Sequence, residues 1–135
     1  MRFKHLKTAL HSVDEIGDIL KHAIAREGVS EEYVRRERGL TNFHVVLNHE
    51  AERTIIIYHN KRRYQLPRLK RSAWIYYSSM GEGFEAIQPA LIKHAKQHKV
   101  KIGFNPGTLQ LKAGFKVIEP VLRVTEVLIV NKEEA

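Results

Sequence analysis

The 135-residue sequence contains no cysteine, so it can form neither a disulfide nor a thiolate metal site, and it has no cysteine nucleophile. It also lacks a long apolar run, because charged residues interrupt every stretch before it reaches the ~20 residues of a membrane-spanning helix. The charged start of the chain is followed by no apolar stretch of the kind that marks a secretory signal. We therefore expect a cytoplasmic protein with no membrane partner.

Acidic residues are few relative to basic ones, with 15 Asp and Glu against 23 Lys and Arg, which gives a net charge of +8. Residues 1–71 carry most of this excess, with 15 basic and 9 acidic side chains. A basic balance favours an anionic partner such as nucleic acid, a nucleotide or a sugar phosphate, without choosing among them. The hydrophobic content of 43% is ordinary for a globular protein. The length indicates one domain.

The first half of the chain shows one clear helical pattern. Residues 7–12 are typical of a short strand, and Ser12 and Glu15 have the spacing of a capping box that begins a helix. Gly28 is placed to end that helix. Apolar residues recur between these two points with helical spacing, at Ile16, Ile19, Leu20, Ala23 and Ile24.

Two β-rich segments follow the helix. Residues 41–47 and 53–59 flank a polar connection and predict an antiparallel pair of strands. After a basic stretch that contains Pro67, the pattern changes. Strands are expected at about 73–77, where the strand should be buried, at 100–104 and at 127–130. Helical material is expected at 84–98 and 114–124, and this alternation predicts a parallel sheet.

Polar segments follow each of the three expected parallel strands, at residues 78–83, 105–107 and 131–134. Ligands of such sheets bind beyond the carboxyl ends of the strands, so these segments are the first candidates for a site. Asn131 is also a good N-cap, and the acidic residues after it suit the first turn of a helix. Because the sequence stops at Ala135, we expect this helix to be cut off.

These segments resemble the PfkB (ribokinase-like) carbohydrate kinases. In that family an acidic, glycine-containing helix start precedes a Gly-Val turn, two lid strands, a polar turn after a central strand and an Asn-x-x-Glu motif. The corresponding segments here are residues 14–18, 28–34, 41–47, 52–55, 105–107 and 131–134. Each motif is weak by itself, but their order and spacing match over nearly the whole chain.

The resemblance implies an α/β fold: part of a ribokinase-like three-layer core with a mainly parallel sheet, plus an antiparallel β lid. It assigns residues 1–135 to a single partial domain, with lid strands at about 41–59 and the α/β core at about 73–135. The implied reaction transfers the γ-phosphate of ATP to a sugar hydroxyl with Mg²⁺, by positioning and charge neutralisation. Sugar and ATP are then the partners. Some family members dimerise through the lid, so a lid-mediated homodimer is expected.

Two signatures of the family are not found in this sequence. One is the Gly-Gly-containing sugar-binding segment that precedes the resembling region in the family. The other is the Gly-Ala-Gly-Asp segment, whose amides form the anion hole and whose aspartate is the catalytic base. We therefore expect an internal fragment of such a kinase, with no catalytic residue of its own and no activity alone.

The resemblance nevertheless implies binding residues. They are Asn105, Asn131 and Glu134 for ATP and Mg²⁺, with Glu134 as the metal ligand, and His44, Ser78 and Ser79 for the sugar. The residues alone leave simpler interpretations open. Asn131 and Glu134 suit helix capping and Asn105 suits a turn. The serines suit a strand-to-helix connection, and His44 an exposed strand position.

A basic run offers an alternative function. Its six cations within residues 61–71 are Lys61, Arg62, Arg63, Arg68, Lys70 and Arg71. Such cations bind phosphates, and Tyr64 among them has a ring on which a base can stack. The simpler interpretation is a solvated surface, and we do not expect nucleic-acid binding because no known nucleic-acid module surrounds the run.

His94 and His98 have the i, i+4 spacing by which one helix presents two metal ligands. No third ligand is evident in the sequence. We therefore interpret both as residues at the border of the apolar helix face, where a cation also suits the helix C-terminus.

Overall fold

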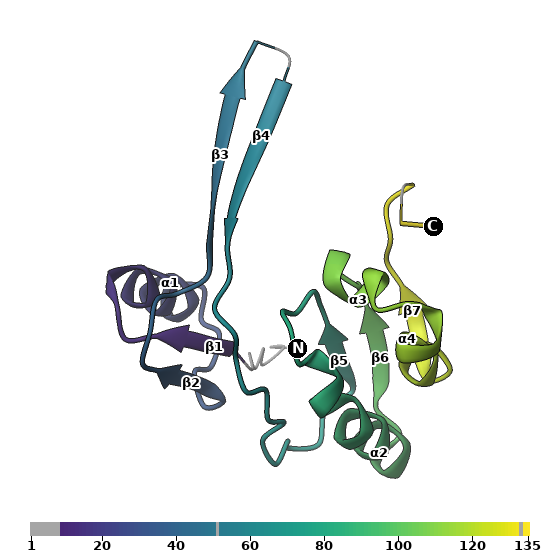
Figure 1. The fold of residues 1–135 in the computed structure, drawn as a ribbon. Coiled ribbons are helices and arrows are strands. Elements are labelled where there is room, and N and C mark those ends of the chain that lie inside the picture. The colour runs from purple at the N-terminus through teal and green to yellow at the C-terminus, as the bar shows by residue number, and fades with distance from the viewer. Residues whose placement is uncertain (1–8, 51, 133) are drawn as a thin grey trace. The chain divides into compact units, whose positions relative to one another are not determined.

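The computed structural model describes residues 9–50, 52–132 and 134–135. They form two compact units, with the boundary between Asn60 and Lys61. Within the described residues, no helix has the length and apolarity that a membrane crossing requires. Each unit is built around its own parallel strands (Figure 1).

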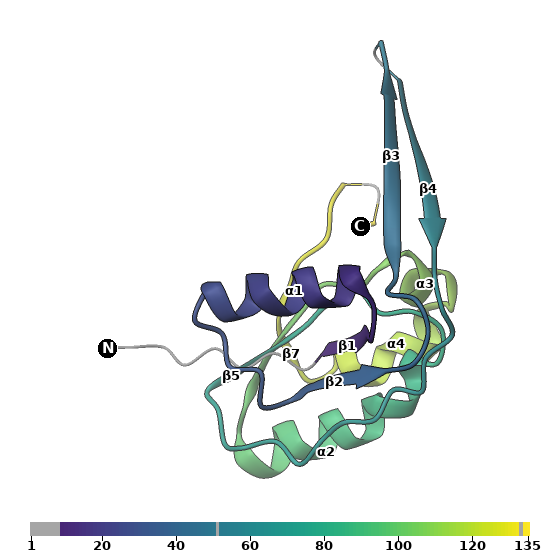
Figure 2. The same cartoon turned by 90° about the vertical axis from the view of Figure 1, so that its left-hand side faces the viewer.

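The first unit contains a β-α-β element followed by a two-stranded ribbon. Its elements are β1 (Ala9–Ser12), α1 (Glu15–Arg26), β2 (Val34–Glu37), β3 (Phe43–His49) and β4 (Glu52–Tyr58). β1 and β2 pair in parallel, from Ala9 opposite Val34 to Ser12 opposite Glu37. Figure 2 shows α1 running alongside this pair.

The helix prediction for the first half is confirmed, but its cap is a different residue. Ser12 is the last residue of β1, whereas Asp14 is the N-cap and accepts a hydrogen bond from the Gly17 N–H. Asp14 replaces Ser12 because it stands directly before the first helical residue, where its short carboxylate reaches the N3 amide. Gly28 follows the helix with a φ of 68°, a conformation that glycine adopts without strain.

We refer to β3 and β4 as the lid ribbon. They pair antiparallel from Phe43 opposite Tyr58 to His49 opposite Glu52, so the predicted pair is confirmed with bounds shifted by one or two residues. Figure 1 shows the ribbon extending away from the β-α-β element of its own unit. Every residue of β3 and of β4 is exposed. The ribbon therefore has two solvent-facing sides.

The second unit is a three-stranded parallel sheet with the order β5-β6-β7. Its elements are β5 (Trp74–Tyr77), a 3₁₀ turn η1 (Phe84–Ile87), α2 (Gln88–His98), β6 (Lys101–Phe104), α3 (Thr108–Lys112), α4 (Phe115–Leu122) and β7 (Thr125–Leu128). The predicted parallel sheet is confirmed. Neither α3 nor β2 was expected from the sequence, and β7 begins two residues earlier than predicted.

Helices pack on one face of this sheet. The core joins Tyr77, Ile102 and Phe104 of the strands to Leu91 of α2 and Val121 of α4. The expectation that the first of these strands is buried is correct only for Tyr77, since Ile75 is half-buried and the other two side chains are exposed. Trp74 and Tyr76 are 48% and 62% exposed, because successive side chains of a strand point to opposite faces.

The predicted helix after Asn131 is not present in the described residues. Lys132 and Glu134 lie in a turn instead. This turn places Asn131 and Glu134 beside α3.

Candidate functional site

The carboxyl edge of the β5-β6-β7 sheet is held together by Asn105. Its backbone N–H donates to the Tyr77 carbonyl at 2.9 Å. Its side-chain Nδ2 donates to the Ile129 carbonyl at 2.6 Å, and its Oδ1 accepts from the Tyr76 hydroxyl at 3.3 Å. The side chain therefore connects the end of β5 to the segment after β7 and has a clear structural role at the predicted position.

Asn131 and Glu134 form a reciprocal pair of hydrogen bonds. The Asn131 N–H donates to Glu134 Oε2 at 3.0 Å, and the Glu134 N–H donates to Asn131 Oδ1 at 2.9 Å. This is the hydrogen-bond pattern of a capping box, but it closes a turn, because no helix follows Asn131 in the described residues. The carboxylate keeps further lone pairs for another ligand, because it offers about four acceptor positions.

The same pair borders a hollow at the edge of the sheet. The hollow has a volume of about 480 Å³ and is lined by Thr108, Leu111, Lys112, Asn131 and Glu134. It therefore joins a hydroxyl, an ammonium group, an amide and a carboxylate around one open space. Such a set is able to hold a phosphate through Lys112 and Thr108, and a hard cation through the oxygens of Glu134 and Asn131.

The loop after β5, which contains Ser78 and Ser79, lies directly against the start of α3. A Cβ atom added at Gly107 would be 1.9 Å from Ser79 Oγ, so only glycine fits this close approach. Gln110 reinforces the contact, because its Oε1 accepts from the Gly107 N–H at 2.7 Å and from the Met80 N–H at 3.3 Å. The second unit thus brings the serine loop and the α3 side of the hollow together.

Gln110 is a residue that sequence reasoning missed. It is fully buried, and its neighbourhood contains other buried polar groups. Within the described residues, the Tyr77 hydroxyl and the Nε2 atoms of Gln88 and Gln110 have no hydrogen-bond partner. Burial raises the pKa of Tyr77, and the nearby amides of Gln110 and Gln88 oppose this shift only in part. The one signal in the sequence is a glutamine three residues after an Asn-Pro-Gly turn.

His44 belongs to the lid ribbon of the first unit, whereas the other five predicted site residues belong to the second. Its Nε2 lies 3.0 Å from Nε2 of His59, and the two rings are stacked with centroids 5.2 Å apart. The sequence did not indicate His59 as a partner. The pair lies close to the root of the ribbon.

The root of the lid ribbon is tied to the start of α1 through Asp14. Its carboxylate accepts from the Gly17 N–H at 2.8 Å, from the Thr41 hydroxyl at 2.6 Å and from the Thr41 N–H at 2.7 Å. The hydrogen bonds from Thr41 are the main cause that lowers the pKa of Asp14. The buried Thr41 hydroxyl also accepts from the Ser12 N–H at 3.1 Å. One carboxylate thus connects the helix cap to the segment that leads into β3.

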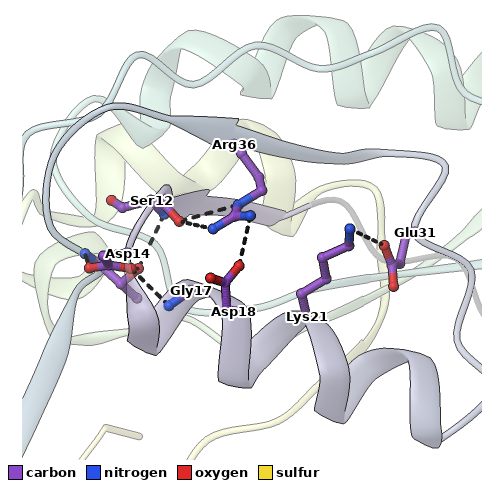
Figure 3. A network of polar contacts seen from close by, with 8 residues as sticks. Ser12, Asp14, Gly17, Asp18, Lys21, Glu31 and Arg36 are labelled. Carbon is purple, nitrogen blue, oxygen red and sulfur yellow. Dashed lines mark hydrogen bonds and ion pairs between the residues drawn. The ribbon is translucent and has the colours of Figure 1, made fainter.

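A second link fixes β2 to the same region (Figure 3). Nη2 of Arg36 donates to the Ser12 carbonyl at 3.0 Å, and its Nη1 lies 2.8 Å from Oδ1 of Asp18. Gly17 faces the Ser12 carbonyl so closely that an added Cβ would be 2.1 Å from this oxygen. These contacts explain why the predicted acidic helix start contains a glycine.

No family model matches the sequence, and no curated protein matches it. One similar solved structure is 2-dehydro-3-deoxygluconokinase from Thermotoga maritima, with 17% identity and a TM-score of 0.72 over 96% of this chain and 45% of that chain. Another is a PfkB family carbohydrate kinase from Listeria grayi, with 14% identity and a TM-score of 0.76 over 97% of this chain and 47% of that chain.

The chain has the fold of the PfkB carbohydrate kinases. This confirms the resemblance and the fold class expected from the sequence. The chain spans slightly less than half of the length of each of the two structures. At these identities the likeness establishes the fold.

Within this PfkB-like fold, the basic run of residues 61–71 is not one continuous exposed face. Arg62 is only 7% exposed. Lys61 lies 3.9 Å from Glu82, and the Tyr64 hydroxyl accepts from the Gly81 N–H at 3.1 Å. Arg62 is thus an exception to the simpler interpretation of a solvated surface, whereas the other five cations of the run are exposed, as that interpretation expects.

The second histidine pair of the PfkB-like fold lies on α2. The rings of His94 and His98 have centroids 4.6 Å apart, and the His94 Nε2 is buried without a hydrogen-bond partner in the described residues. Burial, followed by the neighbouring His98, lowers the pKa of His94. Among the residues that the structure describes, no three His, Cys, Asp or Glu side chains are grouped to hold a metal ion.

Proposed function

We propose that this chain forms the lid and the nucleotide-side sheet edge of a PfkB-like carbohydrate kinase, which transfers the γ-phosphate of ATP to a sugar hydroxyl. The observation that carries the proposal is the hollow shared by Asn131, Glu134, Lys112 and Thr108 at the carboxyl edge of the parallel sheet. Open α/β sheets bind their ligands at this edge. The fold of the two similar kinase structures supports the same assignment.

The donors around the hollow fit magnesium and a nucleotide. Mg²⁺ prefers oxygen ligands and keeps several waters, so one carboxylate near the phosphates is enough to help position it. Glu134 supplies that carboxylate, and the Asn131 Oδ1 orients its backbone. Lys112 neutralises phosphate charge. When bound, Mg²⁺ and ATP supply the charge neutralisation and the phosphoryl group for transfer.

On the sugar side, the proposal assigns hydrogen bonding to His44, Ser78 and Ser79. All three side chains are exposed, and hydroxyl and imidazole groups both donate and accept hydrogen bonds with sugar hydroxyls. The close approach of Ser79 to Gly107 fixes the serine loop in one position. Asn105 is assigned to the nucleotide side, where it also keeps the sheet edge in register.

The 135 residues contain no Gly-Ala-Gly-Asp segment, so the proposal assigns them no catalytic base. We expect no ATP-dependent sugar phosphorylation by this chain alone. A coupled assay of ADP release with a panel of sugars tests this expectation. Turnover that survives repeated purification would contradict it.

Calorimetric titration with Mg·ATP tests the binding part of the proposal. We expect weak binding that Glu134→Gln weakens further, since the substitution removes the charge next to the metal. Glu85→Gln is the matched control, because Glu85 is an exposed carboxylate of the same unit away from the hollow. Equal affinities in all three proteins would remove Glu134 from the site.

Nucleic-acid binding through residues 61–71 is the alternative function. The buried Arg62 and the pairing of Lys61 with Glu82 reduce the number of cations free to face phosphates. Retention on a DNA or RNA column that falls steeply with salt would favour this alternative. Mg·ATP binding without such retention would favour the kinase.

A further inference from the structure

His44 of the lid ribbon and His59, the residue that follows β4, lie side by side. His44 pairs with Ile57 across the ribbon, and His59 is two residues beyond Ile57, which makes it the diagonal neighbour of His44 on the same face. Their Nε2 atoms are 3.0 Å apart and both are at the surface. In this arrangement the Nε2–H of one ring donates a hydrogen bond to the Nε2 atom of the other ring.

The separation of these nitrogens is that of two ligands of one metal ion. At the usual zinc–nitrogen distance, two imidazole nitrogens lie about 2.9 Å apart at a right angle and about 3.3 Å apart at the tetrahedral angle. The observed 3.0 Å falls between these values. The ring centroids are 5.2 Å apart, so the two rings point almost directly at each other, and each ring must turn before both nitrogen lone pairs meet at one ion.

The backbone that carries the pair is fixed at the root of the ribbon. The Asn60 N–H, next to His59, donates to Asn42 Oδ1 at 2.8 Å, and the Asn60 Nδ2 donates to the Leu40 carbonyl at 2.8 Å. The Thr41 hydrogen bonds to Asp14 hold the same root on the other strand. Anchored ligands lose less freedom when they bind, which favours affinity.

From this geometry we infer that His44 and His59 form a binding site for a divalent transition ion, with Zn²⁺ as the probe. Neutral imidazole is a ligand for zinc, copper and nickel, whereas Mg²⁺ prefers oxygen. Water fills the remaining coordination positions, since the pair faces solvent. An ion bound there would link β3 to β4 and stiffen the root of the lid ribbon. This inference concerns the ribbon alone and does not depend on the kinase proposal.

The α2 histidines show why the ribbon pair is the stronger candidate. The Nε2 of His94 is buried, so an ion reaches this nitrogen only if the side chains packed around it move. Both nitrogens of the ribbon pair are accessible and already face each other.

The test is a calorimetric titration of the untagged chain with zinc chloride at about pH 7.5. We expect one ion per chain, and a loss of affinity of about tenfold or more for both His44→Gln and His59→Gln. His49→Gln is the matched control, because His49 is at the far end of β3 and on the other face of the ribbon. This variant should bind zinc as the parent chain does.

Nuclear magnetic resonance of the parent chain gives a readout that needs no variant. The ring signals of His44 and His59 should shift together as zinc is added. The inference is overturned by no binding up to about 1 mM zinc, by unchanged affinity in both variants, or by a loss in only one of them. A first shift at His94 and His98 instead would place the ion on α2 and overturn it as well.

Discussion

At the scale of single residues, the edge of the parallel sheet is held together by the hydrogen bonds of a few side chains. Asn105 connects the end of β5 to the segment after β7 through both ends of its amide. Gln110 holds two backbone amides of neighbouring loops with one oxygen. These side chains keep the loops of the proposed site in place, so substitutions here should act first on stability.

Gly107→Ala should destabilise the chain by about 1–3 kcal/mol, the usual cost of forcing extra volume into a packed site. The added methyl would lie 1.9 Å from Ser79 Oγ and 2.6 Å from Ser79 Cβ, so the serine loop has to move. Urea unfolding followed by circular dichroism measures the change.

Gly103→Ala is the control for this prediction. An added Cβ at Gly103 would lie 3.6 Å from the Tyr76 ring, which is an ordinary contact. The control should therefore unfold close to the parent midpoint. Equal stability of the two alanine variants would contradict the close approach of Gly107 to Ser79.

Asp14 makes the stability of the first unit depend on pH. Its pKa in the folded chain is lowered, mainly by hydrogen bonds from Thr41, from an unfolded value of about 3.9. The carboxylate therefore contributes stability that is fully present above about pH 4 and is lost as the pH falls through the lowered pKa. Asp14→Asn should be less stable than the parent at neutral pH, and this difference should shrink in acid.

Unfolding midpoints of both proteins between neutral pH and about pH 2 test this dependence. Glu15→Gln serves as the control, because Glu15 is an exposed carboxylate next to Asp14 in the chain. A constant difference between the parent and Asp14→Asn at every pH would show that the charge of Asp14 has no part in the network.

At the scale of elements, the lid ribbon and the parallel sheet have opposite surroundings. The side chains of β3 are exposed throughout, whereas Ile102 and Phe104 of β6 are fully buried. A two-stranded ribbon without a packed face is marginally stable by itself. The stability of the ribbon must therefore come from its root, where Thr41 and Asn60 are hydrogen-bonded.

Hydrogen exchange should reveal this difference. We expect the amides of β3 and β4 to exchange much faster than those of β6, because opening of the ribbon exposes almost no buried apolar surface. Exchange measured by mass spectrometry on peptides from each element tests it. Equal protection of the ribbon and of β6 would contradict the prediction and indicate that something covers the ribbon in solution.

At the scale of the whole molecule, the elements that could be predicted from the sequence are those with a periodic pattern of apolar residues. The apolar repeat of α1, the lid pair and the three parallel strands are all visible in the pattern of residues. β2 was missed because its four residues, Val34–Glu37, show no apolar alternation. α3 was missed because five residues are too few for a helical repeat.

The candidate site was predictable only where its contacts are local in the chain. The capping geometry of Asn131 and Glu134 follows from a spacing of three residues. The roles of Asn105 and Gln110 depend on strands and loops that meet only after folding. The pairing of His44 with His59 likewise depends on the register of the ribbon, which the sequence indicates only to within two residues.

The apolar surface of the lid ribbon leads to a prediction about assembly. One face carries Phe43, Val45, Leu47, Ile56 and Tyr58, and Val45 and Ile56 are 42% and 55% exposed. The other face is more polar, since it includes Asn48 and Arg53. Burial of apolar surface contributes ~25 cal/mol per Å². A second copy that covers the first face would therefore be stabilised.

We expect the chain to form a dimer through the Val45 and Ile56 face of the lid ribbon. The net charge of +8 opposes association, but repulsion between surface charges is screened beyond about 8 Å at physiological salt. The mass should therefore be that of a dimer at high micromolar concentration, measured by light scattering after size-exclusion chromatography. The double variant Val45→Lys and Ile56→Lys should be a monomer, because four like charges would face one another across the interface. Asn48→Lys on the other face should leave the dimer intact, and a parent chain that is monomeric at low and physiological salt would contradict the prediction.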